Sequence, residues 1–402
     1  MKIKILPSRA EGGLPAPPSK SLSHRYLICA GLAEGESLIR GIAQSEDIAA
    51  TADCLRAIGA ECEIGENCAR VRGTGGKISA RVPLPCRECG STLRFFIPLC
   101  LTAKEKISLT GSERLLARPL EEFEKICRGR GLLFTRGERE IALHGPLTAG
   151  EYRLRGDVSS QFISGLLFAL PLLSGDSRIV MEGEVESRSY IELTRNAQAE
   201  FGVFSEWTDD HTLAVSGGQR YRAAEAAVEA DCSNAAFLCA LGEVGHAVEV
   251  TGMNPATAQG DRVFAEYFKR LRSGAPTLSL SDCPDLGPIL FALAAEKNGA
   301  RFTGVRRLRL KESDRVAAMA EELGKFGVRL TVGEDEVLVP GGQIRAPREE
   351  LSGHNDHRIV MALAVLCTKY GGVLSGAEAV KKSFPDFFRM LEEAGIQVQR
   401  YE

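Results

Sequence analysis

The segment PAPPSKSLSHR, residues 15–25, gathers hydroxyl and cationic side chains directly before the apolar run YLICAGLA. Lys20 and Arg25 stand five residues apart among three serines, one of which is Ser21. Backbone N–H groups at a helix start, hydroxyls and fixed cations are the groups that bind phosphate or carboxylate. An N-cap serine beside solvated charges gives the same pattern. The segment therefore predicts a helix entrance, with anion binding and plain capping both open.

Two later segments repeat this arrangement. CGSTLRFF places Gly90 and a following arginine at a second predicted helix start. GDVSSQF places Ser159, Ser160 and Gln161 at a third. Each alone is explained by capping, but three at corresponding positions favour binding of a polar, anionic ligand.

Three further candidates are weaker when taken singly. Arg118 stands before a proline in LARPLEEF, where a surface charge is the usual explanation. Ser187 lies in ESRSYIELT, and Lys382 lies in KKSFPDFF before a terminal helix.

The densest cluster of charge is RRLRLKESDRVAAMAEELGKFG. It contains Lys311, Glu312 and Arg315 at the entry of an amphipathic helix, and the spacing predicts that Lys311 and Arg315 share one helix face. Asp285, in PDLGP, heads a second apolar helix. It is either an N-cap or a base toward a bound hydroxyl.

Metal and cofactor motifs are weak or absent. His354, Asp356 and His357 in HNDHRIVMA have metal-ligand types but lack further ligands, so we favour Arg358 as an anion ligand instead. The 12 cysteines are scattered, and the pair Cys86 and Cys89 has no second pair. Neither a phosphate-loop motif nor a dinucleotide fingerprint occurs. We expect no metal and no cofactor.

The elements that carry these residues form a sixfold repeat. Each unit has a polar helix start, an apolar helix of about three turns, a glycine turn and a short alternating strand. Successive units lie 52 to 74 residues apart, with anchors at Lys20, Gly90, Ser159, Ser233, Asp285 and His357. Helices that are apolar all round are buried ones. If they run parallel, their positive N-termini converge and attract anions.

Chain length, net charge, hydropathy and cysteine content limit the classes to which the protein can belong. The 402 residues predict at least two domains, with chain crossings near residues 15–18 and 229–231. A net charge of −3 gives no general attraction to nucleic acid. No apolar run approaches the length of a membrane helix. Scattered, reduced thiols suit a cytoplasmic protein.

Taken together, the motifs resemble those of the 3-phosphoshikimate 1-carboxyvinyltransferase, or EPSP synthase, family over essentially the whole chain. They are SKSLSHR, CGSTLR, RP, GDVSSQF, SYI, PD, LKESDR, NDHR and KKSFPDFF, in the family's order. The resemblance implies an α/β, two-lobed enolpyruvyl transferase fold, each lobe holding three βαβαββ-type units. Residues 16–229 would form the lobe that mainly binds shikimate 3-phosphate. Residues 1–15 with 230–402 would form the lobe that mainly binds phosphoenolpyruvate.

The resemblance also implies an activity: transfer of the enolpyruvyl group of phosphoenolpyruvate to the 5-hydroxyl of shikimate 3-phosphate, with release of phosphate, in a cleft between the lobes. The enzyme would act in the shikimate pathway of aromatic amino acid biosynthesis, as a cytoplasmic monomer with no nucleic-acid or membrane partner. Shikimate 3-phosphate would contact Ser21, Arg25, Ser159, Ser160, Gln161, Ser187, Asp285 and Lys311. Phosphoenolpyruvate would contact Lys20, Gly90, Arg118, Arg315, Arg358 and Lys382.

Roles in the chemistry follow from the resemblance. Asp285 is the expected base on the 5-hydroxyl, and Glu312 is the expected proton carrier at C3 of phosphoenolpyruvate, with Lys311 as its rival. Lys20 is expected to touch both substrates. Gly90 keeps the small residue that leaves room for glyphosate, so sensitivity to that inhibitor is expected. Arg307 and Glu88 depart from the asparagines common at their positions.

Two alternatives stay open. UDP-N-acetylglucosamine enolpyruvyl transferase shares the fold and donor, but it carries a cysteine shortly before the arginine–proline pair. Here no cysteine lies between Cys100 and Cys127. A non-catalytic phosphometabolite-binding protein on the same fold would not need Asp285, Lys311 and Glu312.

Overall fold

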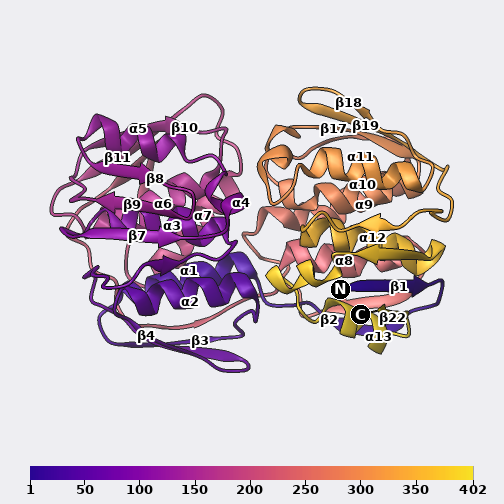
Figure 1. The fold of residues 1–402 in the computed structure, drawn as a ribbon, viewed down its shortest axis with the longest axis horizontal. Helices are drawn as coiled ribbons and strands as arrows, with labels where there is room; N and C mark the ends of the chain where they lie inside the picture. The colour runs from indigo at the N-terminus through magenta and orange to yellow at the C-terminus, as the bar shows by residue number, and fades with distance from the viewer. Residues whose placement is uncertain (402) are drawn as a thin grey trace. The chain divides into compact units, whose positions relative to one another are not determined.

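A computed structural model describes residues 1–401, which form two compact units (Figure 1). The N-terminal unit is Pro18–Glu229. The C-terminal unit combines Met1–Pro17 with the chain from Ala230 onward. Each unit has its own hydrophobic core and three separate β-sheets.

The N-terminal unit repeats one sheet pattern three times. In each sheet the first two strands pair in parallel, and the other two add antiparallel, in the orders β14-β3-β5-β4, β6-β7-β9-β8 and β10-β11-β13-β12. A parallel pair needs a crossover connection. This connection is α3 between β6 and β7 and α6 between β10 and β11, whereas most of the unit lies between β3 and β14. The elements in chain order are α1 (Lys20–Leu32), β3 (Glu36–Arg40), α2 (Glu46–Ala57), β4 (Glu61–Ile64), β5 (Cys68–Arg72), β6 (Leu84–Pro85), α3 (Gly90–Cys100), β7 (Lys106–Thr110), α4 (Glu113–Leu116), α5 (Glu121–Gly129), β8 (Leu133–Arg136), β9 (Glu140–His144), β10 (Glu151–Arg155), α6 (Ser160–Ala169), η1 (Leu170–Leu172), β11 (Ser177–Glu182), α7 (Arg188–Glu200), β12 (Glu206–Asp209), β13 (Thr212–Val215) and β14 (Glu225–Ala227).

The C-terminal unit uses the same pattern twice, in the orders β16-β17-β19-β18 and β20-β21-β1-β22, and has a two-stranded parallel sheet of β2 and β15. Figure 1 shows β17, β18 and β19 above α10 and α11 in this unit. The elements are β1 (Lys2–Leu6), β2 (Glu11–Pro15), α8 (Cys232–Glu243), β15 (Ala247–Thr251), η2 (Gly260–Val263), α9 (Phe264–Ser273), β16 (Thr277–Ser279), η3 (Pro284–Leu286), α10 (Gly287–Glu296), β17 (Gly299–Thr303), η4 (Arg306–Leu310), α11 (Arg315–Lys325), β18 (Thr331–Val332), β19 (Glu336–Pro340), β20 (Leu351–Ser352), α12 (His357–Tyr370), β21 (Gly372–Ser375), η5 (Ala377–Lys382), α13 (Phe387–Glu393) and β22 (Gln397–Tyr401).

The six apolar helices of the repeat are buried, as predicted. They are α1, α3 and α6 in the N-terminal unit and α8, α10 and α12 in the C-terminal unit. In α10 every residue from Gly287 to Ala295 is buried, because no polar side chain interrupts GPILFALAA. Such helices have no solvent face and pack against sheets or helices on all sides.

The repeat that the sequence predicts is confirmed, with one departure. The unit built on α8 has only the two strands β2 and β15 in its sheet and lacks the terminal antiparallel strands of the other five. This shorter unit accounts for the gap of only 52 residues between Ser233 and Asp285.

One local prediction is wrong. Lys311 and Arg315 do not share a helix face, because η4 ends at Leu310 and α11 begins only at Arg315. Asp314 caps α11 by accepting hydrogen bonds from the N–H groups of Val316 and Ala317. A capping aspartate must lie outside the helix, so the cap excludes Lys311 from α11.

The cysteines agree with the reduced state that their spacing indicates. All 12 are free, and all but Cys68 and Cys239 are buried. Within residues 1–401, none of the helices combines the length and the apolar character that crossing a membrane requires.

Candidate active site

Lys20 is fixed by an ion pair at the start of α1. Its Nζ donates to Oδ2 of Asp47, on α2, at 2.9 Å. The Lys20 and Asp47 side chains are only 12% and 13% exposed. Ser19 caps the helix by accepting a hydrogen bond from the N–H of Leu22. Because the pair is mostly desolvated, its attraction is stronger than that of a surface ion pair.

Arg25, one turn further along α1, is buried and held on three sides. Its Nε donates to Thr194 Oγ1 at 2.8 Å, and its two terminal nitrogens donate to the carbonyls of Ser21 and Tyr190. Burial lowers the pKa of Arg25 to about 10, with Tyr190 opposing the shift. The guanidinium therefore stays cationic at neutral pH, with its orientation set by α1 and α7.

The starts of α3 and α6 are joined through Gln161. This side chain accepts from Arg94 Nη1 at 2.8 Å and donates to Ser91 Oγ at 2.9 Å. Ser159 caps α6 by accepting a hydrogen bond from the N–H of Gln161, and Ser160 is buried behind it. Two helix N-termini thus lie side by side, as their shared pattern predicted.

Gly90, the first residue of α3, lies directly against Arg118. A Cβ added at Gly90 would come within 2.4 Å of Arg118 Nη1. The glycine is therefore required for this position of the guanidinium, because any side chain would displace it. Ser187 is fully buried, with a left-handed backbone (φ 54°), at the start of α7, the helix that also holds Arg25.

Asp285, in η3 of the C-terminal unit, is surrounded by three cations. Its Oδ1 accepts from Arg315 Nη1 at 2.8 Å and lies 3.2 Å from Lys311 Nζ. Its Oδ2 lies 3.5 Å from Arg358 Nη2. The carboxylate is 20% exposed, so it is accessible as well as paired.

Arg315 connects three carboxylates, with a side chain that is 1% exposed. Besides Asp285 it donates to Glu312 Oε2 at 2.8 Å and, through Nε, to Asp356 Oδ2 at 2.9 Å. Burial acts to lower the pKa of Arg315, but the carboxylates of Asp356, Glu312 and Asp285 outweigh burial and hold that pKa above its ordinary value. Arg315 is a permanent cation that fixes the positions of both predicted acid–base carboxylates.

Arg358 and Lys382 complete the cationic set. Arg358 is 2% exposed and donates to Asn234 Oδ1, on α8, at 2.9 Å. Lys382 is buried at the end of η5, and its Nζ donates to the backbone and side-chain oxygens of Asn355 at 2.8 and 2.9 Å.

Lys311 differs from the other cations because its pKa is lowered. Burial is the main cause, Asp285 opposes it, and the guanidiniums of Arg315 and Arg307 add to it. An ammonium with a lowered pKa beside a carboxylate is suited to passing a proton, which a guanidinium cannot do. Arg307 itself is buried, so the arginine that replaces the expected asparagine takes part in this electrostatic cluster.

The C-terminal cluster can therefore bind a polyanion and move a proton. Lys311, Arg315 and Arg358 converge on one carboxylate, and an anionic ligand group would compete with that carboxylate for them. Preorganised cations of this kind stabilise negative charge that develops during a reaction.

The sequence model of the family described as EPSP synthase (3-phosphoshikimate 1-carboxyvinyltransferase) matches residues 6–391. The chain belongs to this family. Relatives named 3-phosphoshikimate 1-carboxyvinyltransferase include one from Clostridium kluyveri, 36% identical over 99% of this chain and 98% of the relative. Another, from Clostridium novyi, is 35% identical over 98% of this chain and 97% of the relative.

Solved structures show the same fold. The EPSP synthase from Acinetobacter baumannii superposes with a TM-score of 0.81 at 23% identity, covering 99% of this chain and 100% of that one. The family and the fold predicted from the nine motifs are thus confirmed.

Each unit of this EPSP synthase family member holds its own group of predicted residues. The N-terminal unit contains Lys20, Ser21, Arg25, Gly90, Arg118, Ser159, Ser160, Gln161 and Ser187. The C-terminal unit contains Asp285, Lys311, Glu312, Arg315, Arg358 and Lys382. Contacts join Asp285, Lys311, Glu312, Arg315 and Arg358 into one network, whereas Lys382 bonds to the loop before α12.

Sequence reasoning missed the partners that hold these side chains. Asp47 holds Lys20, Thr194 holds Arg25, and Asn234 holds Arg358. The sequence indicates Asp356 only as a possible metal ligand, but its two oxygens accept from Ser313, Arg315 and the N–H of Arg358. The sequence marks Asn234 and Asp356 as polar residues at the start of predicted apolar helices, and it gives no signal for Asp47 or Thr194.

Two groups within residues 1–401 have ligand atoms close enough to share a metal ion: His24, Asp47 and Cys89, and Glu321, Glu322 and His354. In each group a lysine ammonium already bonds a carboxylate, Lys20 on Asp47 and Lys325 on Glu322. A cation would have to displace that lysine, so neither arrangement favours a metal over the ion pair.

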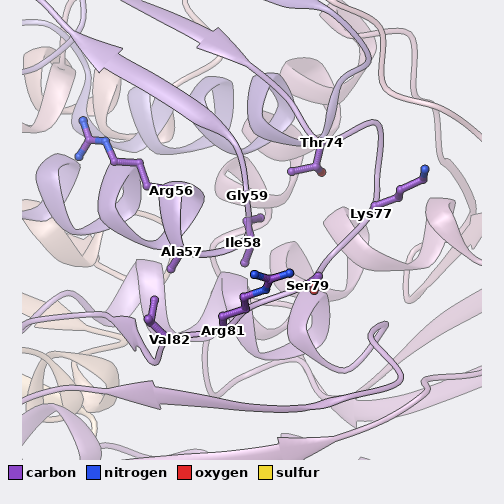
Figure 2. Close-up of a pocket in the computed structure, with 9 residues that line it drawn as sticks. All are labelled: Arg56, Ala57, Ile58, Gly59, Thr74, Lys77, Ser79, Arg81 and Val82. Atoms are coloured by element: carbon purple, nitrogen blue, oxygen red, sulfur yellow. The ribbon is translucent and has the colours of Figure 1, made fainter.

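A surface pocket of about 530 Å³ lies apart from these clusters, at the end of α2. Figure 2 shows the Arg56 side chain pointing away from Arg81 and the other labelled residues. Arg56 is already bonded to Asp53 and to the carbonyl of Cys62. None of the predicted site residues lines this pocket.

Proposed function

We propose that the protein transfers the enolpyruvyl group of phosphoenolpyruvate to the 5-hydroxyl of shikimate 3-phosphate and releases inorganic phosphate. The observation that carries this proposal is the network around Asp285, in which an accessible carboxylate contacts Lys311, Arg315 and Arg358. Membership of the EPSP synthase family, over nearly the full length of its relatives, supports the same reaction. Both substrates are polyanions, which accounts for buried cations in a chain of net charge −3.

The reaction needs addition followed by elimination. C3 of phosphoenolpyruvate gains a proton while the 5-hydroxyl loses one and its oxygen bonds to C2. C3 then returns a proton, the C2–O bond to phosphate breaks, and phosphate leaves with that electron pair. We assign Asp285 as the base on the 5-hydroxyl and Glu312 or Lys311 as the proton carrier at C3.

The remaining predicted residues bind the substrates in this proposal. Ser21, Arg25, Ser159, Ser160, Gln161 and Ser187 would hold shikimate 3-phosphate, together with Asp285 and Lys311. Lys20, Gly90, Arg118, Arg315, Arg358 and Lys382 would hold phosphoenolpyruvate. Arg25, Arg315 and Arg358 suit these tasks because their guanidiniums are buried, preorganised donors. We further propose a cytoplasmic location, which the free cysteines support.

The test is phosphate release from phosphoenolpyruvate with shikimate 3-phosphate as acceptor, comparing the wild type with Asp285→Asn. We expect turnover in the wild type and a fall in kcat of about 10²–10⁴-fold in the variant, the range for loss of a positioned acid–base group. Turnover only with UDP-N-acetylglucosamine would instead assign the sister activity. Tight binding of shikimate 3-phosphate without turnover would assign a binding protein.

A further inference from the structure

The loop before α12 has an unusual backbone. Residues 352–356 run from the last residue of β20 to the start of α12, and within them His354 and Asn355 have φ values of 48° and 54°. Two successive residues other than glycine in the left-handed region are unfavourable unless their surroundings hold them there. The conformation of this loop therefore depends on the contacts that hold it.

Glu322, on α11, provides those contacts. Its carboxylate is fully buried and accepts from His354 Nε2 at 2.8 Å and from the N–H of Ser352 at 3.0 Å. Lys325 Nζ donates to both of its oxygens, at 2.9 and 3.0 Å. One buried group thus binds the backbone at the loop's start and the imidazole at its centre.

The other side of the loop reaches two of the cations in the proposed site. Asn355 accepts from Lys382 Nζ through its backbone and side-chain oxygens. Asp356 caps α12 and accepts from Arg315 Nε at 2.9 Å. The loop is therefore the connection between the Glu322–His354 pair and the positions of Lys382 and Arg315.

We propose that Glu322 and His354 are positioning residues, which hold residues 352–356 in the conformation that places Lys382 and Arg315 for phosphoenolpyruvate. This rests on the proposed function of those two cations. Within residues 1–401, the side-chain hydrogen bonds of Glu322 and His354 go to Lys325, to the N–H of Ser352 and to each other, and to none of the residues assigned to substrate. A buried ion pair seldom stabilises a fold more than apolar packing would, so its use in specifying one loop conformation is the better account of it.

The first test compares His354→Asn with a matched control, Glu321→Gln. Asparagine tolerates the left-handed backbone but removes the imidazolium–carboxylate bond. Glu321 is adjacent on α11, and its side chain is 59% exposed, 3.8 Å from Lys325. At saturating shikimate 3-phosphate we expect His354→Asn to raise KM for phosphoenolpyruvate about tenfold, as for a displaced charged contact. In His354→Asn, KM for shikimate 3-phosphate should change by less than about twofold. In Glu321→Gln, neither the KM for phosphoenolpyruvate nor the KM for shikimate 3-phosphate should change by more than about twofold.

A double-mutant cycle separates positioning from general weakening. Because His354 acts partly through Lys382, adding His354→Asn to Lys382→Met should raise KM for phosphoenolpyruvate by clearly less than the roughly tenfold rise expected in the wild-type background. Lys20 lies in the other unit, so adding His354→Asn to Lys20→Met should still raise KM for phosphoenolpyruvate about tenfold. Full additivity with Lys382→Met, or an equal rise in both KM values, would overturn the proposal.

A measurement that needs no turnover distinguishes failure of this proposal from failure of the proposed function. Amide hydrogen exchange should become faster in His354→Asn, but not in Glu321→Gln, in peptides that contain residues 352–356 and 380–384. If the wild type releases no phosphate but this change occurs, the coupling stands and the proposed reaction is at fault. Unchanged exchange at residues 380–384 would overturn the coupling whatever the activity.

Discussion

At the residue scale, the buried cations of this protein are held by partners distant in the chain. Lys20 shows the principle, because its ammonium would be mobile and hydrated on a surface but is fixed by Asp47 on another helix. A long side chain loses rotamer freedom when it is held, and a charged hydrogen bond offsets that loss. An anion that reaches Lys20 then meets a charge that needs no reorganisation.

The Lys20–Asp47 pair predicts a specific loss. Asp47→Asn removes the negative charge that lies beside the mostly buried ammonium of Lys20 and puts a neutral amide in its place. We expect kcat/KM for phosphoenolpyruvate to fall about tenfold, because truncating one side of a desolvated ion pair also mispositions the other. Steady-state phosphate release measures this.

Asp53→Asn is the matched control for this prediction. Asp53 lies on the same helix, and its pairs with Arg56 and Arg87 are more exposed, so its loss should be nearly neutral. An Asp47→Asn enzyme as active as the wild type, or a control that loses as much, would contradict a specific role for Asp47.

At the element scale, the sequence was most informative about the buried helices. Lys20, Gly90 and His357 each begin a helix where the repeat placed them, because a polar start and an all-apolar body leave few other structures possible. The partners Asp47, Asn234 and Asp356 could not be predicted, since a helix pattern says nothing of which distant helix lies beside it. Lys311 and Arg315 show the opposite error: local spacing suggested one face, but the capping of α11 by Asp314 separated them.

The contact between α11 and the loop before α12 has a predictable pH dependence. The hydrogen bond to Glu322 raises the pKa of His354, and burial only partly opposes it. Burial acts to raise the pKa of Glu322, but the bonds from His354, Lys325 and the Ser352 N–H outweigh it and lower that pKa. Glu321 also faces His354 and favours its charged form, while Lys325 opposes it.

The sign of the effect follows from these two directions. Because folding raises the pKa of His354, the stability that this group contributes is complete below the unfolded pKa of about 6.5. This contribution is lost as the pH rises through the folded pKa. A lowered glutamate pKa gives stability that is present above about 4.3 and is lost at lower pH. The Glu322–His354 pair should therefore stabilise the folded protein most between about pH 4.3 and about pH 6.5.

Melting temperatures measured at two pH values check this. His354→Asn should melt about 2 °C below the wild type at pH 6, and the difference should shrink at pH 9. His211→Asn, at an exposed turn of the N-terminal unit, should show no such trend. A wild-type advantage that grows toward pH 9 would contradict the raised pKa.

At the scale of the whole molecule, the two units differ in how the chain builds them. The N-terminal unit is one continuous stretch whose ends are joined, because the Ser19 N–H donates to the Glu229 carbonyl at 2.8 Å and β14 pairs with β3. The C-terminal unit is discontinuous. Its β1 lies between β21 and β22, and its β2 pairs with β15.

This difference predicts opposite outcomes for two truncations. A fragment of residues 18–229 keeps three complete sheets and a closed core, so it should fold alone and melt cooperatively. A fragment of residues 230–402 lacks β1 and β2, which leaves β21 and β22 without the interior strand that joins them. The backbone N–H and C=O groups of β21 and β22 that pair with β1 in the whole protein then have no partner in the sheet. This fragment should therefore not fold until residues 1–17 are joined to it by a linker. Circular dichroism and thermal melting of the two fragments, and of residues 230–402 linked to residues 1–17, measure this. Cooperative folding of residues 230–402 without the N-terminal strands would show that β1 is dispensable, against its interior place in the sheet.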